Sequence, residues 1–548
     1  MNTSYKELLN KAIEANHTRG YWAAYPEFPK VYGEEADPKG KEAFAKMLNN
    51  NFTELGVDSN EWIGEEVSPF LQIGTGIRYP KLSIDTLISQ SKNAQTNWAT
   101  SDIETRAQIL IDSLERIKLR FFDIAYATMH STGQAYMMSF QASGPHASDR
   151  ALEVIAMGYE ALSSIPAKAS WVKPMGKFDL TLTKSFKGIP KGIGLVIGCS
   201  TFPIWNTVPG LFADLITGNV TIVKPHPKAV LPIAIVVAEI RNALAAAGYD
   251  KNIVQLAVDT TESPITKQLA EHDEVKLIDF TGGNAFGDYI EGIAHKVTFT
   301  EKAGVNCAIV DSAVDFKTVA GNLAFSACLY SGQMCTAPQN IYIPETGIET
   351  ATGKISFDEA AQQIAQAIND LVNNPKMGSH ILGAIQSDVT LNRLKEAPSW
   401  GGKLLLASQP IKNDEFENAR CFSPAVIELT SADHEIYQKE CFGPIIYIIK
   451  TKSTEDSIKI TEDLSRQKGA ITCLAYCTSE ATMQTIENRM NAVFTPVSFN
   501  FQGAAFVNSH AAFSDFHVTG GNASGNASFT NAEYINKRFV WVGNRYMS

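Results

Sequence analysis

The sequence contains no cluster of basic residues and no long hydrophobic run. Its 47 lysines and arginines are outnumbered by 58 aspartates and glutamates, which gives a formal net charge of −11. An acidic surface of this kind favours solubility, and no segment resembles the Lys/Arg-rich stretches that bind a phosphate backbone. The longest apolar stretch, at 229–240, is interrupted by Pro232 and is too short to span a bilayer. We therefore expect no nucleic-acid partner and no membrane insertion.

Cysteine and histidine are sparse, and the first twenty residues lack the apolar core of a signal peptide. The 8 cysteines of the 548 residues form no CxxC pair of the kind that binds zinc, and they are too few for a disulfide scaffold. The 10 histidines are scattered, and neighbours such as His510 and His517 have no ligand-like partners in the sequence. These features predict a cytoplasmic protein with no metal site.

The arrangement of apolar residues predicts an α/β fold. Residues 81–165 show helical periodicity, whereas FDLTLTKSF (178–186) alternates as an exposed strand does. From residue 192 onward, short apolar runs alternate with helical segments such as 235–247. This pattern is typical of a parallel sheet covered on both faces. The runs are GIGLVIG (192–198), NVTIVKP (219–225), IVQLAVD (253–259) and EVKLIDF (274–280).

The same alternation of apolar runs and helical segments returns towards the C-terminus. A helix is predicted at 357–372 and a strand at 445–450, and NKRFVWVG (536–543) is interpreted as a final strand. The segment 494–529 is rich in glycine, asparagine and serine, which predicts loops.

Two segments carry residues suited to covalent catalysis. In SGQMCTAPQ (331–339), Cys335 follows a glycine-containing turn, and an accessible thiolate there would be a nucleophile. A lone cysteine is more often a small buried hydrophobic residue, so the neighbouring residues decide the interpretation. In FTEKAGVNCAIV (299–310), Glu301 lies 34 residues before Cys335. A glutamate is more often a solvated surface charge, and its distance from Cys335 favours catalysis instead.

Three further segments are suited to binding a dinucleotide. In IDFTGGNAFGDYI (278–290), Thr281, Gly282, Gly283 and Gly287 mark a turn between a strand and a helix, where a backbone can approach a phosphate. In GNVTIVKPHPK (218–228), Lys224 ends a strand and can bind a ribose hydroxyl or a phosphate, although a surface lysine is the commoner case. KECFGPIIYI (439–448) can also be a simple turn before a strand.

In the order and spacing that they have along the chain, these five segments resemble the active-site and cofactor-binding segments of the aldehyde dehydrogenase superfamily. The matching patterns are Gly-Gln-x-Cys-Thr, a glutamate followed by a turn of small residues, Phe-Thr-Gly, Gly-Asn-x-x-x-x-Lys-Pro and Glu-x-Phe-Gly-Pro. The resemblance implies that Cys335 is the nucleophile and Glu301 the base that activates water. It also implies that Lys224 and Glu440 bind the two riboses of NAD or NADP, and that Phe442 packs by the nicotinamide ring. The substrate implied is a small-molecule aldehyde.

Three features depart from the family pattern. After Glu301, the usual Glu-Leu-Gly-Gly-Lys becomes Glu301-Lys302-Ala303-Gly304-Val305, so this match is partial. The oxyanion-hole asparagine of the family is replaced by Thr201, whose hydroxyl can donate a hydrogen bond but is shorter. Three possibilities stay open: Thr201 donates, which we favour; Asn206 donates; or catalysis is slow. The glutamate common in NAD-preferring members is replaced by Pro227, which removes repulsion against a 2′-phosphate and suggests that NADP is accepted.

The resemblance further implies two Rossmann-like α/β domains, a bridging strand element for oligomerisation, and a homodimer or homotetramer. The expected division is 1–80 as an N-terminal extension, 81–172 and 189–303 as the dinucleotide-binding domain, 304–525 as the catalytic domain, and 173–188 and 526–548 as the oligomerisation element. The segments GYWAAYPEFPKVYG (20–33) and EWIGEEVSPF (61–70) are similar to the PaaN branch, which implies phenylacetic acid degradation through a coenzyme A-linked aldehyde. A coenzyme A-acylating dehydrogenase and a catalytically weakened binding protein remain the alternatives.

Overall fold

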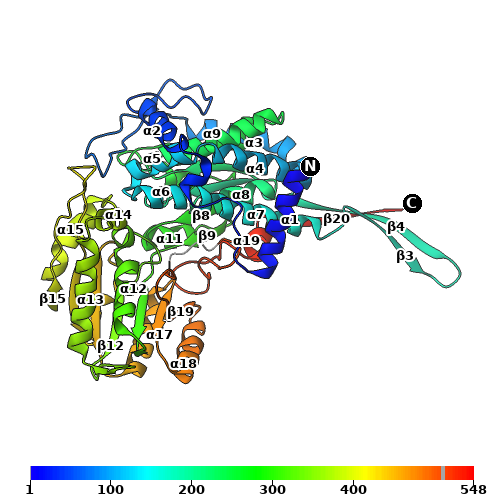
Figure 1. Ribbon diagram of the computed structural model, residues 1–548. Helices are drawn as coiled ribbons and strands as arrows, with labels where there is room; N and C mark the ends of the chain where they lie inside the picture. The colour runs from blue at the N-terminus through cyan, green and yellow to red at the C-terminus, as the bar shows by residue number, and fades with distance from the viewer. Residues whose placement is uncertain (1, 508–511, 548) are drawn as a thin grey trace.

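Two parallel β-sheets, each covered by helices, form the body of the protein in a computed structural model that describes residues 2–507 and 512–547 (Figure 1). The first sheet has five strands, all parallel, in the order β7-β6-β5-β8-β9. Nearly every residue of β5 and β6 is buried, because helices cover both faces and leave no polar side of the sheet. The strands are β5 (Ile193–Ile197), β6 (Val220–Lys224), β7 (Val254–Leu256), β8 (Val275–Thr281) and β9 (Val297–Glu301).

Helices from the first half of the chain pack around this sheet. Ser83 and Asp102 cap the first two of them by accepting hydrogen bonds from the backbone N–H groups of Thr86 and Thr105. The helices are α3 (Ile84–Thr100), α4 (Ile103–Lys118), α5 (Phe121–Thr132), α6 (Tyr136–Ser143), α7 (Pro145–Ser163), α8 (Val208–Ile216), α9 (Leu231–Ala246), α10 (Thr266–Glu271) and α11 (Asn284–Glu291).

The second sheet has seven strands in the order β15-β16-β17-β12-β10-β18-β19, parallel except for the β15–β16 pair. Its strands are β10 (Cys307–Val310), β12 (Asn340–Pro344), β15 (Lys403–Leu406), β16 (Ala425–Thr430), β17 (Ile445–Thr451), β18 (Cys473–Tyr476) and β19 (Val497–Phe499). The covering helices are α12 (Phe316–Cys328), α13 (Phe357–Val372), α14 (Gly378–Leu382), α15 (Asp388–Glu396), α16 (His434–Tyr437), α17 (Thr454–Lys468) and α18 (Glu480–Asn491). The segment predicted to consist of loops therefore contains one short strand, β19.

A three-stranded antiparallel sheet, β20-β4-β3, extends away from the body as an arm that carries the C-terminus (Figure 1). Its strands are β3 (Lys168–Pro174), β4 (Asp179–Pro190) and β20 (Phe539–Met547), and the short helix α19 (Ala532–Asn536) precedes β20. Large apolar side chains lie exposed on the arm, among them Phe178 (64% exposed), Val540 (53%) and Tyr546 (54%).

The N-terminal segment folds against the helices that pack around the five-stranded sheet. Helix α1 (Thr3–Thr18) packs on α7, and α2 (Ala36–Met47) packs on α5. Two small sheets complete the structure: β1 (Trp62–Ile63) with β2 (Tyr79–Pro80), and β11 (Ser312–Ala313) with β13 (Ile348–Thr350) and β14 (Gly353–Ile355). Among the described helices, none has the length and apolar character needed to cross a membrane.

These observations confirm the predicted fold class of two Rossmann-like α/β units with a bridging strand element. The predicted strands at 192–198, 219–225, 253–259 and 274–280 correspond to β5 to β8, and the helix predicted at 357–372 is α13. The long alternating segment at 178–186 lies in β4, where exposed and half-buried residues alternate.

Candidate active site

Cys335 follows a turn with an unusual backbone conformation. Tyr330 and Ser331 have φ of 51° and 52°, and Gly332 has φ of 62°, so three successive residues are in the left-handed region. A non-glycine residue pays strain there, which the surroundings must hold in place. The Tyr330 hydroxyl donates to the carbonyl of Thr132 at 2.6 Å, and the Ser331 hydroxyl donates to that of Leu382 at 3.0 Å. At Gly332, a Cβ would lie 2.6 Å from the carbonyl oxygen of Gly443.

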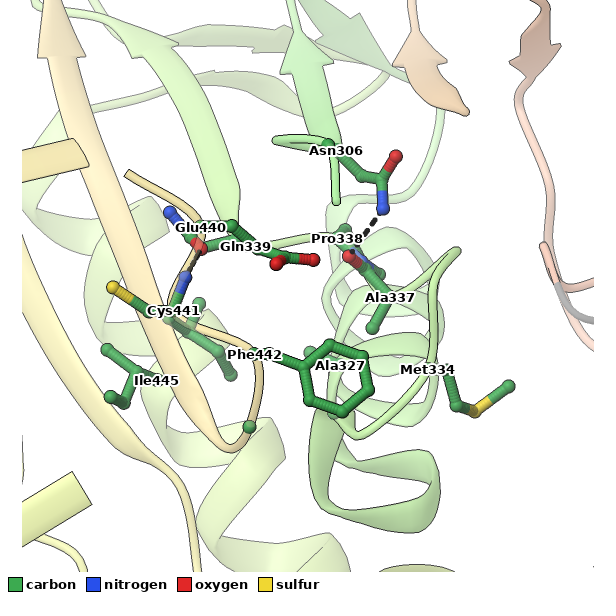
Figure 2. Close-up of a pocket in the computed structure, with 14 residues that line it drawn as sticks. Asn306, Ala327, Met334, Ala337, Pro338, Gln339, Glu440, Cys441, Phe442 and Ile445 are labelled. Atoms are coloured by element: carbon green, nitrogen blue, oxygen red, sulfur yellow. Dashed lines mark hydrogen bonds between the residues drawn. The ribbon is translucent and has the colours of Figure 1, made fainter. Parts of the chain in front are cut away.

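The chain after Cys335 is fixed by side-chain amides (Figure 2). Asn306 Nδ2 donates to the carbonyl of Cys335 at 2.6 Å and to that of Ala337 at 3.2 Å. Gln339 Oε1 accepts from the backbone N–H of Cys441 at 2.6 Å, which ties this loop to the segment carrying Glu440. The cavity between these segments measures only ≈ 20 Å³, too little for a ligand. The loop that carries Cys335 is therefore anchored by these hydrogen bonds.

Two side chains, Glu301 and His517, lie close to the Cys335 thiol. Glu301, at the end of β9, is 1% exposed, and its Oε2 accepts a hydrogen bond from Asn206 Nδ2 at 2.9 Å. Glu301 Oε1 lies 3.3 Å from His517 Nε2, and the same nitrogen lies 4.0 Å from Cys335 Sγ. The His517 ring packs edge-on against Trp205, with centroids 4.5 Å apart. Glu301 and Cys335, predicted as base and nucleophile, thus lie together.

The electrostatics of this site favour a protonated thiol at rest. Burial, and next the negative charge of Glu301, raise the pKa of Cys335 well above its ordinary value. Burial also raises the pKa of the nearby Cys199 to about 11. Because only the thiolate is a strong nucleophile, Cys335 needs an adjacent base when it reacts. Glu301 is placed to serve as that base.

Two large cavities meet at Cys335. One, of ≈ 650 Å³, is lined largely by apolar and aromatic side chains and by His517; the other, of ≈ 750 Å³, is bordered by the C-terminal ends of the strands of the five-stranded sheet. Phe202, Asn206 and Cys335 line both. In a parallel sheet, ligands bind outside the carboxyl ends of the strands, which makes the second cavity the nucleotide side.

The predicted glycine turn borders the nucleotide-side cavity. Thr281, Gly282 and Gly283 line it where β8 leads into α11, and no side chain caps that helix in the described part of the chain. A Cβ added to Gly283 would meet open space, so a phosphate could approach the uncapped N–H groups. Gly287 does not line the cavity; a Cβ there would lie 2.4 Å from the Lys302 side chain, so this glycine allows α11 to pack on β9.

Lys224 and Pro227 also line this cavity, together with a carboxylate that the sequence did not single out. Asp259 follows β7, and its Oδ1 lies 2.6 Å from Lys224 Nζ, both side chains being at most 3% exposed. Burial is the main cause of a lowered pKa for Lys224, partly offset by Asp259. Asp259 therefore places a carboxylate in the cavity, although the glutamate common in NAD-preferring members is replaced by Pro227.

Glu440 and Phe442 also line the nucleotide-side cavity, and the charge of Glu440 acts on the Cys335 thiol. Burial raises the pKa of Glu440 to about 7, although the nearby Arg393 acts in the opposite direction. Arg393 Nη1 donates to the carbonyl of Phe442 at 2.9 Å and so holds this turn.

The two candidate oxyanion donors lie in different places. Asn206 borders both cavities, whereas Thr201 borders only the nucleotide-side cavity. The carbonyl of Thr201 accepts a hydrogen bond from Gln134 Nε2 at 2.7 Å, which fixes its loop. The structure therefore brings Asn206, the second of the two candidates, up to Glu301.

Sequence reasoning missed His517 and Asp259. His517 has no ligand-like partner near it in the sequence, yet in the structure it lies against Glu301 and Cys335. His510 falls outside the described residues. Asp259 was visible as the polar residue at the end of an apolar run, directly after a strand, which is a signal that could have identified it.

Comparisons with known proteins agree with this geometry. The family model described as "Aldehyde dehydrogenase family" matches residues 69–535. The crystal structure of an NAD-dependent aldehyde dehydrogenase from Burkholderia multivorans is 43% identical, with a TM-score of 0.97; the match covers 100% of this chain and 98% of that one.

Two more distant proteins are also similar. An alpha-ketoglutaric semialdehyde dehydrogenase from Bacillus subtilis is 24% identical over 70% of this chain and 75% of its own length. The structure of an NADP-dependent glyceraldehyde-3-phosphate dehydrogenase from Bacillus halodurans, complexed with NADP, is 18% identical with a TM-score of 0.69. That match covers 91% of this chain and 97% of the other, and it bears on the fold alone.

Proposed function

The chain belongs to the aldehyde dehydrogenase family, and from that premise we propose that it oxidises an aldehyde to a carboxylic acid with NAD or NADP. The observation that carries the proposal is the junction of the two cavities, where Cys335 and Glu301 lie together. In this proposal the half of the chain around the five-stranded sheet (81–172 and 189–303) binds the dinucleotide, and 304–525 supplies the nucleophile.

The reaction follows from the positions of three groups. Glu301 takes the proton of Cys335, and Sγ bonds to the carbonyl carbon of the aldehyde. The backbone N–H of Cys335 and Nδ2 of Asn206 stabilise the resulting oxyanion; we assign this role to Asn206 rather than Thr201 because Asn206 borders both cavities. A bound nicotinamide would accept the hydride that leaves the former carbonyl carbon. Loss of this hydride re-forms the C=O bond as a Cys335 thioester, and Glu301 gives the proton that it took from Cys335 to solvent. Glu301 then activates a water molecule that hydrolyses the Cys335 thioester and releases the acid.

The nucleotide-side cavity fits a dinucleotide. The uncapped start of α11 at Gly283 suits a pyrophosphate, and Glu440 and Phe442 are placed to hold the nicotinamide end beside Cys335. At the far end, the buried Asp259 opposes a 2′-phosphate because it adds negative charge and neutralises Lys224. We therefore propose that NAD is preferred over NADP, in place of the NADP acceptance that Pro227 suggested. The relative that is 43% identical is named NAD-dependent, which supports this choice.

The other cavity supports a bulky aromatic or apolar aldehyde. Trp205, Phe325 and Leu329 line it, and Tyr21 and Glu27 of the N-terminal segment also reach it. We propose a role in the breakdown of aromatic acids, as in the PaaN branch, with a semialdehyde linked to coenzyme A as one form of substrate. The resemblance of residues 20–33 to that branch is the second support, because Tyr21 and Glu27 of this segment line the same cavity.

Acyl transfer to coenzyme A is the alternative outcome of the same intermediate. It needs no activated water, whereas Glu301 lies buried beside Cys335. Hydrolysis is therefore the function that the site supports best. A purely binding role is less well supported, because nucleophile, base and oxyanion donor converge at one point.

The arm formed by β3, β4 and β20 supports assembly into a homodimer or homotetramer. Its exposed apolar residues form a surface that a monomer would leave in water, and a second copy of the chain is the proposed occupant.

Reduction of NAD by purified protein tests the proposal. Wild-type protein should reduce NAD with aromatic aldehydes, and Cys335→Ala should abolish the reaction. Glu301→Gln should give at most one equivalent of reduced cofactor and then stop, because the thioester is no longer hydrolysed. Turnover that requires free coenzyme A, or steady turnover by Glu301→Gln, would contradict the assignment of Glu301.

A further inference from the structure

Three metal-ligating side chains from distant parts of the chain converge beside the reaction centre. Glu301 ends β9, Cys335 lies between α12 and β12, and His517 belongs to the segment between β19 and α19. One ligand atom from each lies within 4.8 Å of the other two. We propose that Glu301, Cys335 and His517 form a binding site for Zn²⁺, and that zinc bound there reversibly inhibits the enzyme.

The donor set is the one that zinc favours. Thiolate, imidazole and carboxylate all bind Zn²⁺, and three protein ligands with a fourth open position are typical of accessible zinc sites. Zn–S and Zn–N or Zn–O bonds of about 2.3 and 2.0–2.2 Å separate neighbouring ligands of a tetrahedral ion by roughly 3.3–3.8 Å. The separation of 3.3 Å between His517 Nε2 and Glu301 Oε1 fits this range. The 4.0 Å between Nε2 and Cys335 Sγ needs to shorten by only a few tenths of an ångström.

One carboxylate oxygen is left available for the ion. Asn206 Nδ2 donates a hydrogen bond to Glu301 Oε2. Glu301 Oε1 is buried and accepts no hydrogen bond from the described residues, and His517 Nε2 lies 3.3 Å from it. The imidazole is oriented by its surroundings: Trp205 packs against the ring, and the backbone N–H of His517 donates to Thr530 Oγ1 at 3.4 Å. Ligands held in place by neighbouring groups bind metal more tightly than free ones.

The charges also balance. A carboxylate and a thiolate together neutralise Zn²⁺, and the imidazole binds as a neutral ligand. On binding, the Cys335 S–H bond is replaced by a Zn–S bond and one proton is released to solvent. No oxidant or reductant is involved, so chelation reverses the step.

The consequence for catalysis rests on the proposed roles of Cys335 and Glu301. Bound zinc occupies both the nucleophile and the base, so it blocks attack on the aldehyde. His517 lines the apolar cavity but not the nucleotide-side cavity, so zinc reaches the site from the aldehyde side. Inhibition should therefore be competitive with the aldehyde. The turn around Gly283, where the pyrophosphate is proposed to bind, lies outside the zinc site. NAD should therefore still bind when zinc is present.

Direct metal binding tests the site without reference to activity. Full-length protein freed of metal with a chelator would be titrated with ZnCl₂ in competition with a chromophoric zinc indicator. Wild-type protein should bind one Zn²⁺, and Mg²⁺ should not compete, because it prefers oxygen ligands. Loss of even an outer-shell partner weakens metal binding by 10–100-fold, so His517→Gln should weaken it by about 100-fold or more. His380→Gln, a histidine on the same cavity, is the matched control and should bind zinc like wild type.

Two further readouts keep the outcomes distinct. Co²⁺ in place of zinc should give a thiolate charge-transfer band and the visible bands of a tetrahedral ion, both lost in Cys335→Ser. Equal zinc affinity in His517→Gln and wild type would overturn the proposal, because zinc would then be bound by the thiol alone. Binding of one Zn²⁺ that requires His517 but leaves NAD reduction unaffected would keep the metal site and refute the catalytic role of Cys335.

Discussion

Replacing Asn206 by alanine should slow the first half of the reaction, which forms the Cys335 thioester, by about 10²–10³-fold. One N–H of the Asn206 amide donates to Glu301 Oε2 at 2.9 Å, and the second remains for the oxyanion formed on the aldehyde. Removal of one oxyanion donor costs about 2.7–4 kcal/mol of transition-state stabilisation, which corresponds to that loss of rate.

The second half of the reaction should also slow. In Asn206→Ala the buried Glu301 carboxylate loses a charge-assisted hydrogen bond, an interaction worth about 1.5–3 kcal/mol in proteins. Glu301 then keeps His517 and the Cys335 thiol as close polar partners but has lost the amide that orients its carboxylate, so the base is less well positioned to activate water. Thr201→Val, by contrast, should change either rate by less than about threefold, because Thr201 borders only the nucleotide-side cavity.

Rapid-mixing measurement of NAD reduction separates the two halves. The pre-steady-state burst reports formation of the thioester, and the later linear phase reports its hydrolysis. Protein with Cys335→Ser provides the background, and NAD affinity measured by cofactor fluorescence shows whether the nucleotide site is intact. A wild-type burst rate in Asn206→Ala, together with a 100-fold loss in Thr201→Val, would refute our assignment and identify Thr201 as the donor.

Three further substitutions test other parts of the structure. Burial raises the pKa of Glu440 to about 7, so the charged form of this carboxyl is lost as pH falls through that value. NAD affinity should therefore rise as pH increases through about 7, and a flat pH profile in Glu440→Gln would identify Glu440 as the titrating group. Asp259→Ser frees Lys224 for a 2′-phosphate and should raise the ratio of NADP to NAD turnover by about tenfold or more; an unchanged ratio would exclude Asp259 as the selecting group. Arg538→Met removes the cation that binds the buried carboxylates of Asp214 and Asp279, and chemical denaturation should show a loss of about 3–5 kcal/mol in the free energy of unfolding.

Much of the fold was predictable because the local signals were strong. Strands β5 and β6 are buried along their length, and β8 is buried over most of its length, since helices cover both faces of the sheet. The alternation in β4 reflects a strand of the exposed arm. Strand β19 was missed because three residues in a loop-rich segment give almost no periodic pattern.

The site was predictable only where its residues belong to compact motifs. Cys335 and the Gly282–Gly283 turn lie in short, ordered patterns, whereas His517 is 182 residues from Cys335 in sequence and is brought to it by tertiary contacts. The choice between Thr201 and Asn206 could not be made from spacing, because it depends on which side chain reaches the junction of the two cavities. At Gly287 the motif was misleading. Its place in the motif predicts contact with a phosphate, but its surroundings indicate that it allows α11 to pack closely on its neighbours.

The segment that carries His517 also connects the reaction centre to the arm. Gly525 pairs with Glu301 by a backbone bridge, and the Asn526 side chain accepts from the backbone N–H of Thr300 at 2.8 Å, so this segment lies directly on β9. Further along, the fully buried Arg538 binds Asp279 of β8 at 2.6 Å immediately before β20 begins. The segment between β19 and β20 therefore connects the reaction centre to the arm through its contacts with β9 and β8.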